Sequence, residues 1–154
     1  MNVRRFLHQR GIAHQMLAHE PTFSAQRMAE MVHVSGDEVA KAVLLKIDGK
    51  YELAVLPATY YVYPELVRQS LQARAVELAT EEECGRIFPD CEVGALPPFG
   101  SLYGLQTVID ASLTEDDEIV FEGNTHHEAI RMKFQDFERI ERPQIATIAC
   151  HHLA

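Results

Sequence analysis

Apolar residues recur along this chain in short runs, some with the spacing of a helix and some with that of a strand. Helical spacing predicts helices before Gly11, from Ser24 to Val32, from Pro64 to Leu71, after Thr80 and from Asp136 to Ile140. Strand spacing predicts a hairpin over 44–56, around the turn signal Asp48-Gly49-Lys50, and strands over 105–109, 118–121, 126–134 and 145–149. Because helices and strands mix without a strict βαβ order, we expect an α+β domain with a mixed, partly closed β-sheet flanked by short helices.

The composition narrows the class of protein. With 154 residues, of which 47% are hydrophobic and 24% charged, the chain fits one soluble domain over 1–154, with 150–154 as a frayed tail. No apolar run is long enough for a signal peptide or a membrane span, so we expect a cytoplasmic protein with no membrane partner. The three cysteines are too few for a disulfide framework, which agrees with a reducing compartment.

The net charge of −9 argues against a protein that binds long nucleic acids over its whole surface, because phosphate contacts need basic patches. A nucleic-acid partner would therefore be contacted only locally.

The loop from Gly94 to Gly100 contains two consecutive prolines, which donate no main-chain hydrogen bond. The remaining N–H groups of Phe99, Gly100 and Ser101 cluster where a glycine lets the backbone approach a ligand, and such a cluster can hold an oxyanion. Taken alone, the same residues fit a rigid connecting loop at least as well.

Lys41 is hard to explain by packing alone. On a strand it would share a face with Val39, Val43, Leu45 and Ile47. A lysine on an apolar face usually meets an anion or a bound ligand. The alternative is that the side chain lies at the start of the strand and extends to water.

The turn Gly123-Asn124-Thr125-His126-His127 places hydrogen-bonding side chains before an apolar strand. His126 would point inward with Ile130 and Met132. An inward histidine can be catalytic, or it can be a core residue with its hydrogen bonds satisfied.

Several other chemistries have little support. Adjacent histidines at 126–127 point to opposite faces of a strand, and Cys150-His151-His152 lies in the expected tail, so the spacing does not favour zinc. The chain has no Gly-x-Gly-x-x-Gly or Walker loop and no Gly-x-Ser-x-Gly elbow. We therefore expect no cofactor and no metal.

Four segments, taken in order, resemble the YbaK/EbsC family, whose members are relatives of the bacterial prolyl-tRNA synthetase editing domain. They are Glu38–Val43 around Lys41, Ala54–Ala58, Gly94–Gly100, and Gly123–His127 followed by Asp136-Phe137. The resemblance covers the chain from about residue 19 to about residue 140.

The resemblance implies a free-standing, metal-independent deacylase that hydrolyses the ester between a wrong amino acid and the tRNA 3′ end. Its substrate would be mischarged tRNA, read at the acceptor end only, and a synthetase would be a plausible partner. The implied catalytic residues are Lys41, Phe99, Gly100, Ser101 and His126. The implied substrate-binding residues are Gly94, Leu96, Pro98, Asn124 and Thr125. Pro97-Pro98 stands where some relatives have Ser or Thr before the proline, so the amino acid removed does not follow from the resemblance.

Two rival interpretations come from other classes. A non-catalytic module on the same fold would bind an aminoacyl or nucleotide-like ligand, or a partner protein, without turnover. A metal-dependent hydrolase would be sensitive to chelators.

Overall fold

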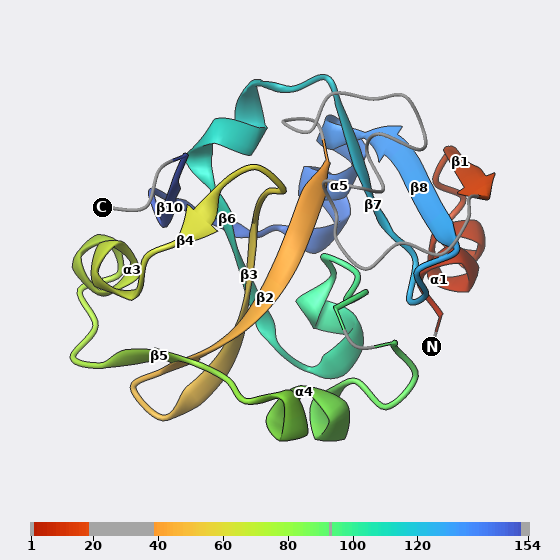
Figure 1. Cartoon of the computed structure of the whole chain (residues 1–154). Coiled ribbons are helices and arrows are strands. Elements are labelled where there is room, and N and C mark those ends of the chain that lie inside the picture. Colours follow the sequence, from red (N-terminus) through yellow and green to blue (C-terminus); the bar gives the residue numbers. More distant parts are fainter. Residues whose placement is uncertain (1, 19–38, 93, 152–154) are drawn as a thin grey trace.

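The computed structural model describes residues 2–18, 39–92 and 94–151. In this part of the chain the strands form three sheets (Figure 1). The five-stranded sheet has the order β5 (Val76–Leu78), β2 (Ala40–Ile47), β3 (Lys50–Pro57), β6 (Gln106–Asp110), β9 (Gln144–Ala146). The three-stranded sheet has the order β1 (His14–Ala18), β8 (Glu128–Lys133), β7 (Glu118–Glu122). The small third sheet pairs β10 (Ala149–Cys150) with β4 (Tyr61–Val62).

The predicted hairpin forms the centre of the five-stranded sheet. β2 and β3 pair antiparallel from Ala40 opposite Pro57 to Ile47 opposite Lys50. Asp48 and Gly49 form the turn with φ angles of 49° and 84°, as a tight hairpin with the strands' right-handed twist requires. β3–β6 and β6–β9 are parallel pairs, so the predicted mixed sheet is confirmed.

The five-stranded and three-stranded sheets meet at the start of β2, where Val39 forms a single parallel bridge with Val120. Neither sheet closes on itself within the described residues. A hydrophobic core lies between them, and Phe99 occupies its centre. The Phe99 ring packs edge-on against Phe6, Phe121 and Phe137 at centroid distances of 5.1 to 5.7 Å, so α1, β7 and α5 share one aromatic cluster.

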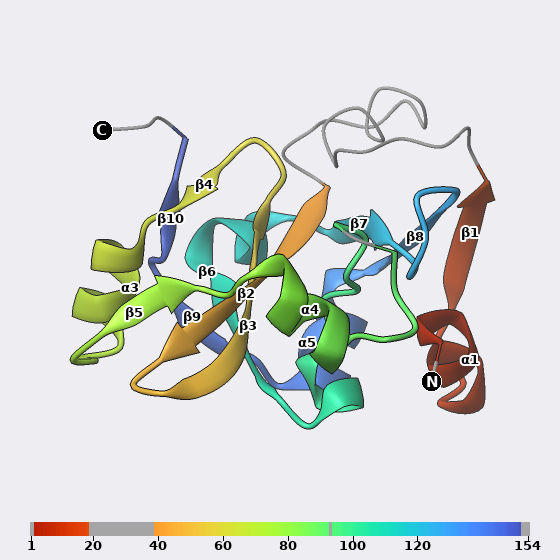
Figure 2. The same ribbon diagram turned by 60° about the horizontal axis from the view of Figure 1, so that its bottom comes forward.

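Four described α-helices surround the sheets (Figure 2): α1 (Val3–Gln9), α3 (Pro64–Ser70), α4 (Glu81–Ile87) and α5 (Phe134–Glu141). Each is close to a predicted helix, and the α+β class is confirmed. The helix expected from Ser24 to Val32 lies outside the described residues.

Two predicted strands have different bounds. β8 begins at Glu128 rather than His126, because residues 123–127 form a turn. The expected strand over 145–149 is divided between β9 and β10, which belong to different sheets. Cys150, expected in a frayed tail, pairs with Tyr61.

Candidate active site

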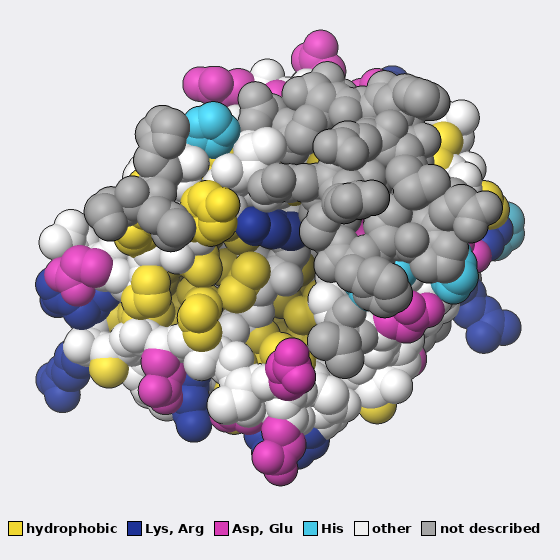
Figure 3. Space-filling view, in the orientation of Figure 1, with side chains coloured by type: hydrophobic (Ala, Val, Ile, Leu, Met, Phe, Trp, Pro, Cys, Tyr) yellow, Lys and Arg dark blue, Asp and Glu magenta, His cyan; other side chains and the backbone are white. Residues whose placement is uncertain are grey.

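A cavity of about 250 Å³ opens beside β2. Its walls come from β2, the end of β5, α4 and the segment that follows α4. The lining is mainly apolar: Ala42, Val43, Leu44, Leu78, Ala79, Glu81, Cys84, Gly85, Phe88, Cys91, Glu92, Gly94 and Leu96. Figure 3 shows the face that β2 crosses, where hydrophobic side chains gather around a hollow and basic side-chain atoms lie at its edge.

The cavity exists because β5 covers only part of the outer edge of β2. β5 pairs with β2 from Leu45 to Ile47, and the Ala79 N–H then donates to the Leu44 carbonyl at 3.0 Å before the chain turns into α4. Main-chain groups of alternate residues point to the same edge of an antiparallel strand. The main chain of Ala42 therefore faces the cavity, two residues beyond the last contact with β5.

α4 is held as a fixed wall of this cavity. Its first turn has a complete capping box, in which Thr80 Oγ1 accepts from the Glu83 N–H at 3.1 Å and Glu83 Oε1 accepts from the Thr80 N–H at 2.9 Å. Glu83 also accepts a hydrogen bond from the Tyr51 hydroxyl on β3. The Thr80 and Tyr51 hydrogen bonds lower the pKa of Glu83 to about 2, so it stays ionised at neutral pH.

The segment after α4 is fixed from behind by Asn124, which is only 2% exposed. Its main-chain carbonyl accepts from the Glu92 N–H at 2.9 Å, and its Nδ2 donates to Cys91 Sγ at 3.3 Å and to the Tyr103 hydroxyl at 3.2 Å. Its Oδ1 accepts from the Val3 N–H of α1 at 3.1 Å. Because Asn124 has φ +74°, a conformation that Asn tolerates better than most residues, the residue type matches both its bonds and its backbone.

His126 reaches the same segment from the other side of the turn. It is 3% exposed, and an ideal Cβ built on Gly94 would lie 3.6 Å from His126 Cε1, so the ring lies against the Gly94 main chain. His126 Nδ1 lies 3.2 Å from Glu122 Oε2. Burial raises the pKa of Glu122 to about 7, against the opposing effect of the neighbouring imidazole. The site thus contains a buried carboxyl next to a buried imidazole, and it is the Glu122 carboxyl whose pKa lies near neutral pH.

Lys41 lies on β2 immediately before the lining residues and is half-buried. Its Nζ lies 5.4 Å from the centroid of the Tyr61 ring. Burial lowers its pKa. Among the described residues no carboxylate forms an ion pair with Lys41, so its positive charge is available to an anion.

The two thiols that line the cavity are poor nucleophiles. Burial, together with the nearby Glu83 and Glu81 carboxylates, raises the pKa of Cys84. Burial also raises the pKa of Cys91 to about 11. Both stay protonated at neutral pH and contribute an apolar, polarisable surface rather than a thiolate.

Phe99, Gly100 and Ser101, at the end of the proline loop, contact other parts of the protein rather than the cavity. Phe99 is buried in the aromatic core. The Gly100 N–H donates to Thr107 Oγ1 at 2.9 Å, and the Ser101 N–H donates to Glu141 Oε2 at 3.1 Å. Two of the three donors expected to hold an oxyanion therefore bond to side chains of β6 and α5.

The structure brings only part of the expected residue set to the cavity. Gly94 and Leu96 line it, His126 touches Gly94, and Lys41 adjoins it on β2. Pro98 is buried, and Thr125 accepts through Oγ1 from the His127 N–H at 3.3 Å. The main-chain N–H groups of Gly94 and Leu96 make no hydrogen bond within the described part of the chain.

Sequence reasoning missed the contribution of α4 and of the segment after it. Cys84 and Phe88, four positions apart, share the helix face toward the cavity, and this i, i+4 spacing was a usable signal. Glu122 as the partner of His126 also went unnoticed, although the two stand four residues apart.

The comparison with known families decides the identity. The model of the aminoacyl-tRNA editing domain matches residues 19–140. The chain belongs to this family. It is 26% identical over 144 residues to the multifunctional Ser/Thr-tRNA deacylase ProXp-y of Escherichia coli strain K12, a match that covers 90% of this chain and 86% of that protein.

Another curated protein and two solved structures also resemble this chain. The proline–tRNA ligase of Geobacillus thermodenitrificans is 34% identical over 73 residues, which cover 47% of this chain and 13% of the ligase. Among solved structures, the hypothetical protein APE2540 has a TM-score of 0.87 at 19% identity and covers 96% of this chain and 99% of its own. A protein described as a proposed trans-editing enzyme for prolyl-tRNA synthetase has a TM-score of 0.83 at 18% identity, covering 95% and 93%. These two likenesses show the shared fold.

The described residues offer neither a metal-binding cluster nor a membrane-spanning helix. Across residues 2–18, 39–92 and 94–151, no three His, Cys, Asp or Glu side chains gather closely enough to hold a metal ion. None of the helices in the same ranges is long and apolar enough to cross a membrane.

Proposed function

We propose that the protein is a trans-acting aminoacyl-tRNA deacylase, which hydrolyses the ester between a mischarged amino acid and the tRNA 3′ end. The observation that carries the proposal is the cavity between β2 and α4. It joins an apolar side-chain pocket to a lysine and main-chain donors that have no ion-pair or hydrogen-bond partner among the described residues. Membership of the editing-domain family and the likeness to ProXp-y support it.

The amino-acid side chain occupies the apolar cavity, and Lys41 at its rim binds the phosphate or ribose of the terminal nucleotide. The N–H groups of Gly94 and Leu96 face the developing oxyanion of the ester carbonyl, where one such donor typically contributes about 3 kcal/mol to transition-state stabilisation. Gly94 thus contacts the substrate through its main chain, and Leu96 through both its main chain and its side chain.

His126 orients the attacking water from its position against Gly94. The proton of that water passes to the imidazole, or is relayed through the neighbouring ribose hydroxyl, and the 3′ oxygen takes up a proton as the ester bond breaks. Glu122 holds the His126 ring in place through the 3.2 Å contact with Nδ1.

The remaining expected residues support this site from behind. Gly100 and Ser101 fix the proline loop through Thr107 and Glu141, while Phe99 anchors the loop in the core. Asn124 holds the segment that carries Glu92 and Gly94, and Pro98 and Thr125 restrict the adjoining backbone.

The apolar lining indicates an uncharged amino-acid side chain. A pocket of this kind separates substrates that differ by one methylene by only about 1 to 3 kcal/mol, so size exclusion must protect correctly charged tRNA. The enzyme acts in the cytoplasm on the acceptor end of tRNA, with a synthetase as a plausible partner.

A panel of mischarged tRNAs tests the proposal with the wild type, Lys41→Ala and the control Lys50→Ala, which removes an exposed lysine at the β2–β3 turn. We expect the wild type and Lys50→Ala to deacylate at least one member, and Lys41→Ala to lose activity while its circular dichroism spectrum is unchanged. A wild type that binds these tRNAs without hydrolysing any of them would instead identify a non-catalytic binding module.

A further inference from the structure

The N-terminal segment is the exception to the acidic composition of the chain. Residues 1–18 contain three arginines, at positions 4, 5 and 10, and no aspartate or glutamate. The remainder of the chain contains eleven lysines and arginines against 23 aspartates and glutamates. A local basic patch therefore stands on an acidic protein.

The fold gathers this charge around a hollow. A depression of about 440 Å³ beside α1 is lined by Asn2, Arg4, Arg5, His8, His14 and Glu128. Arg4 and Arg5 are exposed, and Arg4 lies 3.8 Å from the Glu128 carboxylate. Arg5 forms no ion pair with a described residue, so the described side chains of the hollow carry a net positive charge.

α1 presents this charge because its other face is occupied. Val3, Phe6 and Leu7 are buried in the core, which leaves the arginines on the outer side of the helix. Arg10 continues the basic surface past the helix end, with its guanidinium 5.0 Å from the centroid of the Phe6 ring.

The start of α1, which borders the basic hollow, is linked to the cavity wall. The Val3 N–H donates to Asn124 Oδ1, and Asn124 Nδ2 donates to Cys91 Sγ, which lines the cavity. One side chain therefore separates the start of α1 from the cavity wall. Figures 1 and 2 both show the segment after α4 extending toward α1.

We propose that the α1 hollow binds backbone phosphates of the paired acceptor stem of tRNA while the aminoacylated 3′ end occupies the cavity. The inference rests on the proposed function, and extends it from the single-stranded end to the duplex that follows. Guanidinium groups suit phosphate oxygens because they donate paired hydrogen bonds and stay charged. The imidazoles of His8 and His14 add further polar contacts within the same hollow. The acidic surface repels an acidic protein partner just as it repels RNA. Such a partner, however, does not carry evenly spaced anions next to an aminoacylated 3′ end, as the acceptor stem does.

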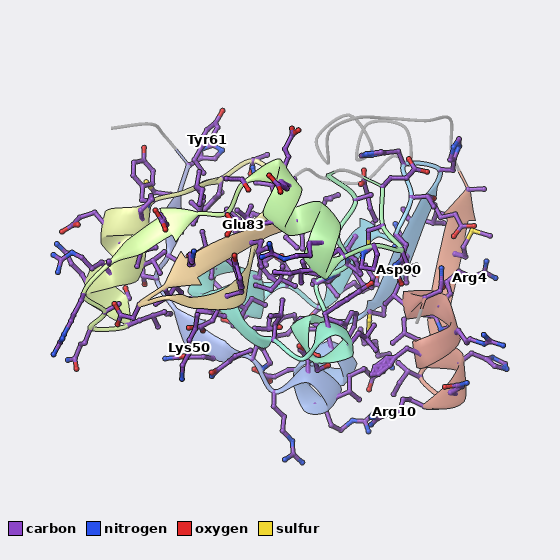
Figure 4. All side chains as sticks on the ribbon, turned by 90° about the horizontal axis from the view of Figure 1, so that it is seen from below. Arg4, Arg10, Lys50, Tyr61, Glu83 and Asp90 are labelled. Carbon is purple, nitrogen blue, oxygen red and sulfur yellow. The ribbon has the colours of Figure 1, made fainter. Side chains whose placement is uncertain are left out.

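The test is the binding of an uncharged acceptor-arm RNA hairpin ending in CCA, measured from 50 to 300 mM salt. The variant Arg4→Gln/Arg5→Gln removes two charges and keeps good helix-forming residues. Its matched control is Lys50→Gln/Arg74→Gln, which removes two exposed charges elsewhere. Figure 4 shows Lys50 at the opposite side of the molecule from Arg4 and Arg10.

We expect the α1 variant to bind the hairpin roughly tenfold more weakly at 0.1 M salt and to lower the slope of log Kd against log salt by about 2, one unit for each lost phosphate contact. The control should match the wild type. Hydrolysis of an aminoacyl ester of a CCA trinucleotide, which lacks the stem, should be the same in all three proteins.

Equal binding of the hairpin by the two double variants would overturn the inference. So would a loss of trinucleotide hydrolysis in the α1 variant, because that would indicate a distorted cavity. The hairpin measurement needs no turnover, so a wild type that hydrolyses no ester would refute the proposed function and still leave the phosphate site measurable.

Discussion

Removal of the Asn124 side chain should weaken the fold at the point where α1, the cavity wall and the 123–127 turn meet. Asn124→Gly keeps the left-handed backbone accessible but leaves the Val3 N–H without its acceptor. A buried donor without a partner costs about 1 to 3 kcal/mol, and the lost contacts to Cys91 and Tyr103 add about 1 kcal/mol. We expect the free energy of unfolding to fall by about 2 to 4 kcal/mol.

Asn124→Ala should cost about 1 kcal/mol more than Asn124→Gly, because alanine adopts φ +74° less readily than glycine. Gln72 provides a matched control, since it is exposed and also has a positive φ, of 54°. Gln72→Ala and Gln72→Gly should differ by a similar amount, whereas neither should show the larger loss from the buried hydrogen bonds.

Urea unfolding followed by circular dichroism measures these differences, provided that the slopes of the unfolding lines agree among the variants. The reasoning is refuted if Asn124→Gly is within 0.5 kcal/mol of the wild type, a threshold of roughly the scatter expected for surface changes. A folded Asn124→Gly protein should also show reduced kcat/KM, because the segment after α4 loses the side-chain hydrogen bond from Asn124 Nδ2 to Cys91.

Three further predictions concern charge, strain and catalysis. Burial raises the pKa of Glu122 to about 7, so ionisation of this carboxyl favours the unfolded state increasingly as the pH rises from 4.5 to 7. The free energy of unfolding of Glu122→Gln, measured relative to the wild type in urea titrations, should therefore rise over that range by up to about 3 kcal/mol. A difference that stays constant with pH would contradict this prediction. Gly100→Ala places a Cβ 2.6 Å from Thr107 Oγ1, so it should lower the melting temperature through about 1 to 3 kcal/mol of strain, and an unchanged melting curve would show that the loop moves freely. Lys41→Met should keep the stability of the wild type. It should raise KM for mischarged tRNA more than it changes KM for an aminoacyl ester that lacks a phosphate. Equal effects on the two substrates would show that Lys41 does not bind the phosphate.

Much of the fold follows from local signals. The turn at Asp48-Gly49 fixes the central hairpin, and the spacing of Thr80 and Glu83 identifies the start of α4. β1 was not predicted, because its residues show no clear alternation and its conformation depends on pairing with β8. Such pairing joins segments more than one hundred residues apart.

The site was only partly predictable for the same reason. Lys41 stood out as a cation on an apolar strand, and the structure leaves it without an ion-pair partner among the described residues. The Ser101 N–H donates its hydrogen bond to Glu141, forty positions away, so the local sequence of the proline loop could not predict this bond. Which main-chain donors remain available at a loop is decided by tertiary contacts rather than by the loop itself.

The most direct test of the account is the structure of the protein with a non-hydrolysable analogue, an aminoacyl-adenosine monophosphate in which an amide replaces the ester. The account predicts that the amino-acid side chain lies between β2 and α4, the carbonyl oxygen faces the N–H groups of Gly94 and Leu96, and the phosphate or ribose lies near Lys41. An analogue bound outside this cavity, or one whose carbonyl faces away from the loop, would contradict it.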